Sequence, residues 1–467
     1  MYIILIFILL VVPFIFSLFT ENPEGTSIEG KYFNPNKFEF LTDLSYKKDG
    51  ETIREHEIFE KEIQLINDAQ EFLIIDCFLY NDEYNKGDIT YPEQVKEMTD
   101  AMIAKKASTD IPIVFITDPL NNFYGAYTQE HIQRLIDGGI DVIVTDHDKM
   151  KDSNPLFSGL YRFYIKRFGV SQNGFIPNFF EKGGPKVSIS SILKLINFKG
   201  NHRKVYINEN EAIISSSNPH DPSAFHSNVA VKFSGTGIND LIESEKAVVE
   251  FSGGTFPDVE YVENISFRDK SISMRVLTEK AIFNALRGNI TEADEGDKIN
   301  IAMFYLSDSR ILNLLSKMSQ KGVEINIIAD PNKDAFGIEK NGSPNRSALS
   351  ELSDKNENIN VRWYNTHGEQ FHTKMATFFY NESNETKVIL GSANFTRRNL
   401  MGYNLETDVE IVVSKDHELS KELEEYFSRI WNNEAGEYTL PLSSYYENRK
   451  FMELLWKFQE FTGLCTW

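Results

Sequence analysis

Two copies of one polar pattern carry the residue types that phosphoryl transfer requires. A His-x-Lys triplet is followed each time by a Ser-x-Asn turn, and the four segments are His202 to Lys204, Ser215 to Asn218, His372 to Lys374 and Gly391 to Asn394. A phosphodiester is anionic and repels nucleophiles, so a site that cleaves it needs cations and hydrogen-bond donors around the nonbridging oxygens. Lys204 and Lys374 can supply the charge, and Asn218 and Asn394 can supply amide donors. Two imidazoles can complete this chemistry as nucleophile and acid, so we expect no metal ion and no cofactor.

Both copies lie in the same local setting. Each triplet precedes an apolar, strand-like run, and a second such run leads to the turn; the four runs are 205–207, 375–380, 212–214 and 388–390. Residues i and i+2 of a strand share a face, so each His and its Lys are expected to point into one cleft. The hairpin would return the Asn to the same end of the strand.

The rest of the chain indicates an internal duplication. Leu73 to Asp82 resembles Ile299 to Asp308, because each is an apolar run that ends in an aromatic-rich triplet and an Asp. The segment from Phe115 to Gly125 likewise resembles the one from Ile327 to Gly337. Strand-like runs followed by helical stretches predict an α/β fold with two related halves. We therefore expect one pseudo-symmetric unit in which the two His-x-Lys sites meet between the halves.

On these motifs the chain resembles the phospholipase D superfamily, which includes cardiolipin synthases and related phosphodiesterases, over residues 40–435. The family pattern is His-x-Lys, four residues, then Asp, with a downstream Gly-Ser-x-Asn. This chain has Glu209 and Phe379 where the two Asp would stand, and Ser215 replaces the first Gly. In the family, that Asp is regarded as a structural residue outside the phosphate site. The resemblance implies two pseudo-symmetric α/β/α sandwich halves with the active site between them.

The resemblance also implies roles for the two His. His202 would be the nucleophile that forms a phosphohistidine, and His372 would be the general acid and then the base for the incoming water or alcohol. The sequence itself leaves open which His plays which part. Ser216 and Ser392 of the turns are predicted to contact substrate.

Each catalytic His needs an acceptor that holds its other ring nitrogen. Glu406 stands at the family position that orients the second His, and Asn228 is the corresponding residue of the first half. An amide orients a ring but stabilises imidazolium less than a carboxylate does, and this asymmetry is compatible with attack by His202 and proton cycling by His372. The alternative for Asn228 is an ordinary residue at the start of a strand.

Other candidate ligands are interpreted as structural. His220, Asp221 and His226 form a weak metal-like cluster without further spaced ligands, so we interpret them as loop residues and predict no metal site. The two cysteines, Cys77 and Cys465, cannot form a disulfide framework.

The N-terminus departs from the ordinary composition of the chain. Residues 2–19 are uncharged and mostly apolar, which is long enough to cross a bilayer. The stretch lacks preceding Lys or Arg and a small-residue cleavage site, so residues 1–22 are predicted to be a transmembrane anchor, with a signal peptide as the alternative. The scarcity of cations just after it favours export of the catalytic body, which we expect to be membrane-anchored and extracytoplasmic.

The first half carries an insert at residues 152–200 that the second half lacks. Between 155 and 200 there are seven Lys or Arg and one acid, interleaved with aromatic residues. Such a segment is typical of membrane contact, and the alternatives are a nucleic-acid patch or a helical pair packed on the core. The net charge of the chain is −21, which opposes binding of a long polyanion more than contact with a lipid.

These observations predict four regions. They are the anchor at 1–22, half 1 at 23–252, half 2 at 253–436 and a helical tail docked on the core at 437–467. The expected function is cleavage or exchange of a phospholipid headgroup, with a phospholipid substrate, a phospholipid membrane as partner and no preference for nucleic acid. The alternatives are a nucleic-acid phosphodiesterase and an inactive lipid-binding relative. We expect a monomer, because one chain holds both halves.

Overall fold

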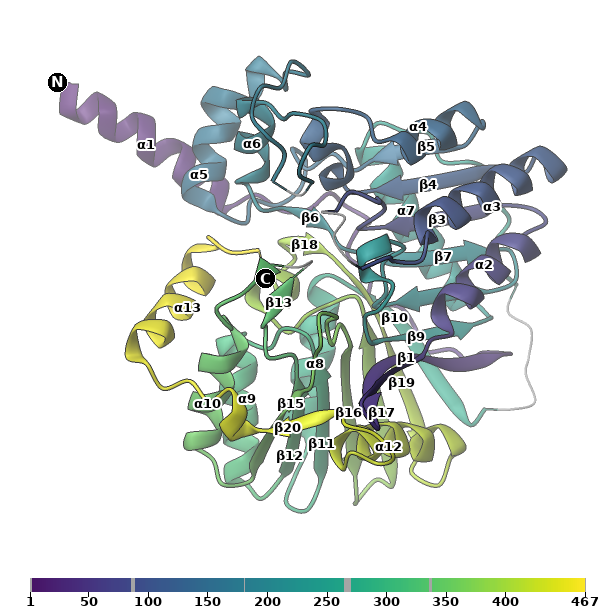
Figure 1. The fold of residues 1–467 in the computed structure, drawn as a ribbon, viewed down its shortest axis with the longest axis vertical. Coiled ribbons are helices and arrows are strands. Elements are labelled where there is room, and N and C mark those ends of the chain that lie inside the picture. The colour runs from purple at the N-terminus through teal and green to yellow at the C-terminus, as the bar shows by residue number, and fades with distance from the viewer. Residues whose placement is uncertain (1, 85–88, 180, 264–269, 336–337, 467) are drawn as a thin grey trace.

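The computed structural model describes residues 2–84, 89–179, 181–263, 270–335 and 338–466. Two eight-stranded mixed sheets dominate it (Figure 1). In spatial order the first sheet contains β2 (Glu51–Glu55), β1 (Phe38–Lys48), β9 (Asn228–Phe233), β8 (Ala212–Ser215), β7 (Lys204–Asn208), β3 (Leu73–Cys77), β4 (Ile113–Thr117) and β5 (Asp141–Val144). The second contains β10 (Ile272–Thr278), β19 (Thr407–Ser414), β17 (Glu385–Gly391), β16 (Lys374–Tyr380), β11 (Lys298–Met303), β12 (Glu324–Ala329), β15 (Ile359–Tyr364) and β20 (Thr439–Pro441).

Seven strands of each sheet repeat one topology. The run β1-β9-β8-β7-β3-β4-β5 corresponds to the run β10-β19-β17-β16-β11-β12-β15. In both runs the last three strands are parallel, and the other neighbours are antiparallel. The predicted α/β fold with two related halves is therefore confirmed. Phe336 and Gly337, which belong to the predicted repeat, lie outside the described residues.

The largest hydrophobic core lies between the two sheets. Strand β7 contributes Val205 and Ile207 to this core, whereas Tyr206 points to the outer face, as the two-residue period of a strand requires. Helices α7 (Gly237–Phe251) and α12 (Glu418–Trp431) also pack into it. The helices that cover the outer faces are α2 (Ile58–Asp68), α3 (Gln94–Thr109) and α4 (Glu130–Asp137) in the first half, and α8 (Lys280–Glu292), α9 (Ser309–Gln320) and α10 (Asn345–Asp354) in the second.

Short elements join the two halves. Strand β6 (Gly200–Asn201) pairs in parallel with β18 (Asn404–Leu405), and Ser227 forms a parallel bridge with Phe371. Near the N-terminus, the Gly30 N–H donates to the Val276 carbonyl of β10 at 2.9 Å, so residues assigned by prediction to the first half bind a strand of the second. The remaining short elements are α11 (Arg397–Leu400), β13 (Asp334–Ala335), β14 (Ile338–Glu339) and the 3-10 segments Pro119–Gly125, Asp221–Ser223 and Leu442–Ser444.

The N-terminal helix α1 (Tyr2–Leu18) packs against the insert. The insert forms α5 (Pro155–Leu160), a π-helical turn (Tyr161–Ile165), a 3-10 turn (Lys166–Phe168) and α6 (Ile189–Leu195). A Cβ at Gly159 would lie 2.4 Å from the Pro13 carbonyl oxygen, so this approach of α5 to α1 requires glycine. The Phe16 and Phe163 rings meet edge-to-face at 5.4 Å, and the Tyr164 hydroxyl donates to the Leu9 carbonyl at 2.8 Å.

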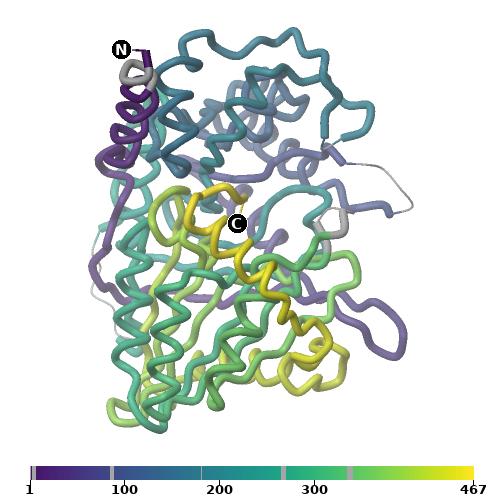
Figure 2. Tube along the Cα trace, turned by 90° about the vertical axis from the view of Figure 1, so that its left-hand side faces the viewer, coloured from purple at the N-terminus to yellow at the C-terminus, as the bar shows by residue number. Residues whose placement is uncertain are grey.

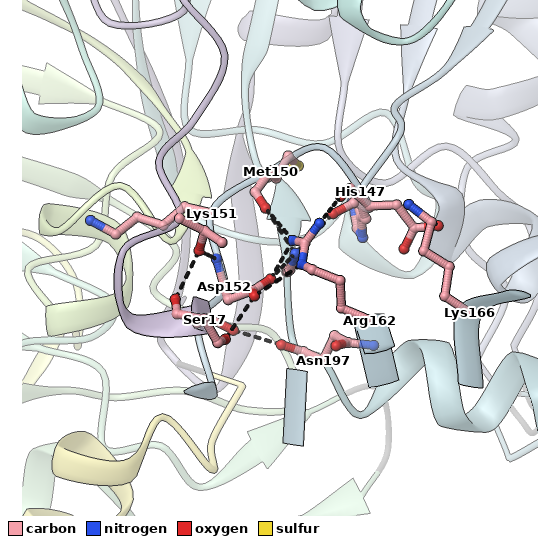
Figure 3. Close-up of polar contacts among 12 residues, drawn as sticks. Ser17, His147, Met150, Lys151, Asp152, Arg162, Lys166 and Asn197 are labelled. Carbon is pink, nitrogen blue, oxygen red and sulfur yellow. Dashed lines mark hydrogen bonds and ion pairs between the residues drawn. The ribbon is translucent and has the colours of Figure 1, made fainter. Parts of the chain in front are cut away.

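Asp152 fastens the end of α1 to the insert (Figure 3). Its carboxylate accepts from Ser17 Oγ at 2.7 Å, from Arg162 Nη2 at 2.7 Å and from Lys199 Nζ at 2.6 Å. Burial alone would raise the pKa of Asp152, but Lys199 and Arg162 outweigh it and lower that pKa. Lys166 pairs with Asp148 at 3.6 Å, so at least three of the seven cations of the insert make ion pairs within this region. The insert is therefore partly a packed structural element, in line with the interpretation of a helical pair packed on the core.

The prediction of a transmembrane span at residues 2–19 is not supported. Over the described ranges, no helix combines the length and the apolarity that crossing a membrane needs.

The C-terminal tail forms helix α13 (Lys450–Thr462). Met452, Trp456 and Glu460 are buried on one face of this helix, which lies near α10. The opposite face is apolar and exposed.

The residue between His202 and Lys204 generates a stability prediction. Arg203 points away from the site and is fully buried, with Nη1 at 3.0 Å from Glu245 and Nη2 at 2.7 Å from Glu279. Arg203→Met leaves both carboxylates without their cation, so we expect it to lower the free energy of unfolding by about 3–5 kcal/mol in urea denaturation. Thr373→Val is the matched control at the same position of the second triplet, and we expect it to cost ~1 kcal/mol or less. Equal losses in the two variants would contradict this prediction.

Candidate active site

Each candidate catalytic His is fixed by a backbone hydrogen bond from the other half. The His202 N–H donates to the Leu405 carbonyl at 2.9 Å, and the His372 N–H donates to the Ser227 carbonyl at 2.8 Å. These bonds continue the parallel contacts of β6 with β18 and of Ser227 with Phe371. The residue that follows each acceptor, Glu406 or Asn228, is thereby brought beside the imidazole of the opposite half.

The two imidazoles are oriented in a crossed arrangement. His202 Nδ1 lies 2.9 Å from Glu406 Oε2, and His372 Nδ1 lies 3.2 Å from Asn228 Oδ1. The expectation that Glu406 orients the second His was wrong, because it assumed pairing within each half. With Nδ1 held in both rings, Nε2 is the nitrogen that can attack or move a proton.

Lys204 and Lys374 are held in equivalent ways. Lys204 Nζ donates to the His202 carbonyl at 2.6 Å, and Lys374 Nζ donates to the His372 carbonyl at 2.7 Å. The expected grouping of each His with its Lys is thus found in both halves.

Two aromatic residues that were not predicted from the sequence line the site. The Phe78 ring lies 4.7 Å from the His202 ring and 5.1 Å from Lys204 Nζ. The Phe304 ring lies 4.9 Å from the His372 ring and 5.1 Å from Lys374 Nζ. The signal was present, since both Phe begin the aromatic-rich triplet at the end of the duplicated strands β3 and β11.

Asn218 and Asn394 lie buried in the turns that follow β8 and β17. Asn394 Oδ1 accepts from the Tyr305 N–H at 3.3 Å, whereas Asn218 Oδ1 has no hydrogen-bond partner among the described residues. Neither side-chain nitrogen donates to a described group, so both amides can donate to an anion.

The two turn serines support the orienting residues instead of facing substrate as predicted. Ser392 Oγ donates to Glu406 Oε2 at 2.6 Å, and Ser216 Oγ donates to Asn228 Oδ1 at 3.1 Å. Both serines are fully buried. Asn399, which the sequence did not single out, donates its side-chain amide to the other oxygen of Glu406. Glu406 is therefore held by an imidazole, a hydroxyl and an amide.

Burial sets the charge state of the site. It lowers the pKa of His202 and of His372 well below 6.5, and the nearby lysines lower both further. Burial also lowers the pKa of Lys204 to about 8 and that of Lys374 well below 10.5, the latter with help from Lys204. The pKa of Glu406 is raised by burial to about 7. Because an anion favours protonated neighbours, a bound phosphodiester would return charge to the lysines and to one imidazole.

The positions of the missing family Asp lie far from this site. Glu209 and Phe379 are five residues beyond Lys204 and Lys374, which is about 16 Å along a strand. Glu209 accepts from the Gln70 and Glu71 N–H groups at 3.2 Å, and Phe379 packs under Lys298 at 4.8 Å. Their substitution leaves the groups around the imidazoles in place.

The weak metal-like cluster makes protein contacts. His220 Nδ1 lies 2.8 Å from Ser223 Oγ, Asp221 accepts from the Val95 N–H at 3.1 Å, and His226 Nδ1 accepts from the Gln370 N–H at 3.2 Å. In the part of the chain that the structure describes, no group of three or more His, Cys, Asp or Glu is arranged to hold a metal ion.

The sequence of residues 286–431 matches a family model described as the cardiolipin synthase, PLD-like domain. That range contains His372, Lys374, Asn394 and Glu406, and the first half repeats its strand order and its site. Residues 286–431 belong to the phospholipase D superfamily. Members of this superfamily are phosphodiesterases and transferases.

The fold of the chain is similar to that of one solved structure over nearly the full length of both proteins. The chain aligns over 93% of its length with 95% of phosphatidylserine synthase from Haemophilus influenzae Rd KW20, at a TM-score of 0.60 and 11% identity. It aligns over 92% of its length with 54% of polyphosphate kinase from Porphyromonas gingivalis, at a TM-score of 0.48 and 14% identity. It aligns over 36% of its length with 97% of Nuc, a phospholipase D family member from Salmonella typhimurium, at a TM-score of 0.28 and 19% identity. No curated protein matches the chain in sequence.

The buried lysines of the site are expected to lower the stability of the folded protein. Lys374 has a lower pKa when folded than when unfolded, so its cost is full at pH values below the folded pKa and vanishes as pH rises towards 10.5. We expect Lys374→Met to raise the free energy of unfolding at pH 7 by about 1 kcal/mol or more, with a gain that shrinks at alkaline pH. Thermal unfolding at several pH values measures this. Exposed Lys317→Met is the control, expected within ~0.5 kcal/mol of wild type. A less stable Lys374→Met protein at pH 7 would contradict the prediction.

Proposed function

We propose that the protein is a phospholipase D-type enzyme that cleaves or exchanges the headgroup phosphodiester of a membrane phospholipid through a phosphohistidine. The observation that carries the proposal is the unequal support of the two imidazoles. A buried carboxylate, Glu406, lies behind His202, and a neutral amide, Asn228, lies behind His372. A ring that becomes covalently phosphorylated gains positive charge, which the carboxylate stabilises and the amide does not.

In the first step His202 Nε2 attacks phosphorus, and the bond from phosphorus to the leaving alcohol breaks. The alcohol takes a proton from Nε2 of His372, which received it when the anionic substrate bound. Lys204, Lys374, Asn218 and Asn394 are placed to neutralise the nonbridging oxygens. In the second step neutral His372 takes a proton from water or an acceptor alcohol, whose oxygen attacks phosphorus and displaces His202. Water gives hydrolysis, and an alcohol gives transfer.

The apolar and basic groups on the surface of the protein favour a phospholipid over a nucleic acid as the substrate. Several apolar side chains of α1 are exposed, including Phe7, Leu10, Ile15 and Phe16. The adjoining insert is basic, and the rest of the chain is strongly acidic. Basic and apolar groups together suit the surface of an anionic membrane, whereas an acidic body repels a long polyanion. Contact of α1 with the membrane surface takes the place of the predicted span, and an extracytoplasmic location stays a prediction.

The role of each His can be tested by trapping the intermediate. With bis(p-nitrophenyl) phosphate the leaving group needs little protonation, so His372→Ala should still form an adduct but lack the base that resolves it. We expect mass spectrometry of digested His372→Ala protein to find the phosphoryl adduct on His202. His202→Ala should form none. An adduct on His372 in the His202→Ala protein would reverse the two assignments.

The substrate class is tested with vesicles of phosphatidylglycerol and phosphatidylcholine that contain glycerol. We expect headgroup release in the wild type and its loss in His202→Ala, by at least about 10³-fold, because this variant lacks the proposed nucleophile. The ratio of phosphatidic acid to exchanged lipid separates hydrolysis from transfer. Single-stranded DNA serves as the competing substrate. Cleavage of DNA without turnover of lipid would replace this proposal with a nuclease, and no turnover of either would leave the inactive relative.

The depressed pKa of Lys204 predicts the alkaline limb of the pH profile. A lysine whose pKa is lowered to about 8 is charged below that pH and neutral above it, so attraction of the phosphodiester is lost as pH rises through 8. We expect kcat/KM to fall about tenfold per pH unit above this point, with a smaller effect on kcat because the bound anion keeps the lysine protonated. Lys204→Arg, which stays charged, should move the limb to higher pH in its residual activity. A flat kcat/KM between pH 7 and 9.5 would contradict the assignment.

A further inference from the structure

A cavity of about 540 Å³ lies between α1, the start of α5 and the C-terminal helix α13. This is within the range of about 300–1,000 Å³ that is usual for small-molecule sites. Its apolar walls come from all three elements and include Phe14, Leu18, Leu156, Phe458, Phe461 and Leu464. None of the residues assigned to catalysis lines it.

Two arginines of α11 give this cavity a positive wall. Arg398 is buried, and its Nη2 donates to the Gly463 and Cys465 carbonyls at 2.8 and 2.7 Å, while its Nη1 donates to the Phe198 carbonyl. Its Nε has no hydrogen-bond partner among the described residues. Arg397 Nη1 donates to the Phe461 carbonyl at 3.1 Å. Among the described residues neither arginine makes an ion pair, although Arg397 is near enough to Glu460 to oppose the rise in the pKa of that carboxyl. Part of their charge therefore remains for a ligand.

Glu460 is the acidic residue that lines the cavity, and it does not cancel this charge. One carboxylate oxygen accepts from the Ser309 N–H at 3.0 Å. Burial raises the pKa of Glu460 to about 7, so the carboxyl is partly protonated at neutral pH. The cavity therefore combines apolar walls with a net positive side, which is complementary to an acyl chain joined to an anionic group.

The cavity is continuous with an apolar stripe on α13. Phe451, Leu454, Phe458 and Phe461 recur at helical spacing, and they are 72, 66, 56 and 77% exposed. Helices α1 and α13 project on the same side of the molecule, at the left of Figure 1 and towards the viewer in Figure 2. An exposed stripe of this kind is suited to contact with a bilayer surface, from which a chain could enter between the two helices.

We propose that this cavity binds one acyl chain of an anionic membrane phospholipid, with the phosphate held by Arg397 and Arg398. The occupied state would exclude water from the apolar walls and place the phosphate beside the two guanidinium groups. Asn399, the next residue, donates to Glu406, so the site adjoins the network that holds His202. The proposal concerns binding alone and does not depend on turnover.

The test uses the full chain with vesicles of phosphatidylcholine and phosphatidylglycerol in equal amounts. A small fraction of the phosphatidylglycerol carries a photoreactive diazirine near the end of one acyl chain. We expect mass spectrometry to locate crosslinks in residues 14–18 and 458–465. His202→Ala protein should give the same crosslinks, which separates this proposal from the proposed activity. Crosslinks spread over the surface without enrichment in these segments would overturn the proposal.

Two matched variants distinguish a cavity from a general apolar surface. Phe461→Glu places a charge at the cavity wall, whereas Phe451→Glu places the same charge on the same stripe away from the cavity. Both side chains are exposed, so both variants should fold, as thermal unfolding would verify. We expect Phe461→Glu to reduce crosslinking by about tenfold or more and Phe451→Glu to reduce it much less. Equal losses, or no loss in either variant, would overturn the proposal.

The anionic group is tested by Arg397→Gln. We expect this variant to lose the preference for a phosphatidylglycerol probe over a phosphatidylcholine probe that the wild type shows. No preference in the wild type would overturn the role of the arginines. Lysophosphatidylglycerol should compete with the probe. Competition by oleate alone would overturn the assignment to a phospholipid in favour of a fatty acid.

Discussion

The parallel pairing between β6 and β18, with its counterpart at Ser227 and Phe371, is the constraint on which the site depends. It fixes the backbone of each His-x-Lys triplet to the half that does not contain it. The same pairing delivers Glu406 to His202 and Asn228 to His372. Each half thus supplies one imidazole and the group that orients the other imidazole. The site is a property of the interface, and the large core between the two sheets stabilises that interface by burying apolar surface from both halves.

Burial in this interface destabilises charged groups. Some of these groups are paired with opposite charges, and others are not. Arg203 is compensated by two carboxylates on the side away from the site. Lys204 and Lys374 bond to carbonyl oxygens, and their pKa values are depressed by burial. Structural charge is therefore paired within the protein, whereas the charge at the site is left for an anionic ligand to complete. This difference in pairing separates the residues that hold the halves together from those proposed to act on a phosphodiester.

The sequence predicted what local periodicity and repetition encode. The duplicated strands, the α/β class and the grouping of each His with its Lys follow from patterns within short segments, and the structure contains all three. The crossed partners of the imidazoles could not be predicted, because they depend on contacts between residues 204 and 144 positions apart. Ser216 and Ser392 were misread for a different reason, because each donates to a residue that follows on the neighbouring strand of its own half. The structure does not support the predicted membrane span, because no described helix has the length and apolarity that crossing a membrane needs.

Glu406 and Asn228 occupy equivalent places in the two halves, and their difference has a genetic consequence. Two identical subunits around a twofold axis would be obliged to carry the same residue at both places, so any substitution would alter both imidazoles together. Joining both copies in one chain releases that restriction and lets selection act on each copy separately. The insert of the first half and the helix α13 after the second illustrate the same freedom at larger scale. Pseudo-symmetry in this chain is therefore best regarded as a starting point from which its two copies have specialised.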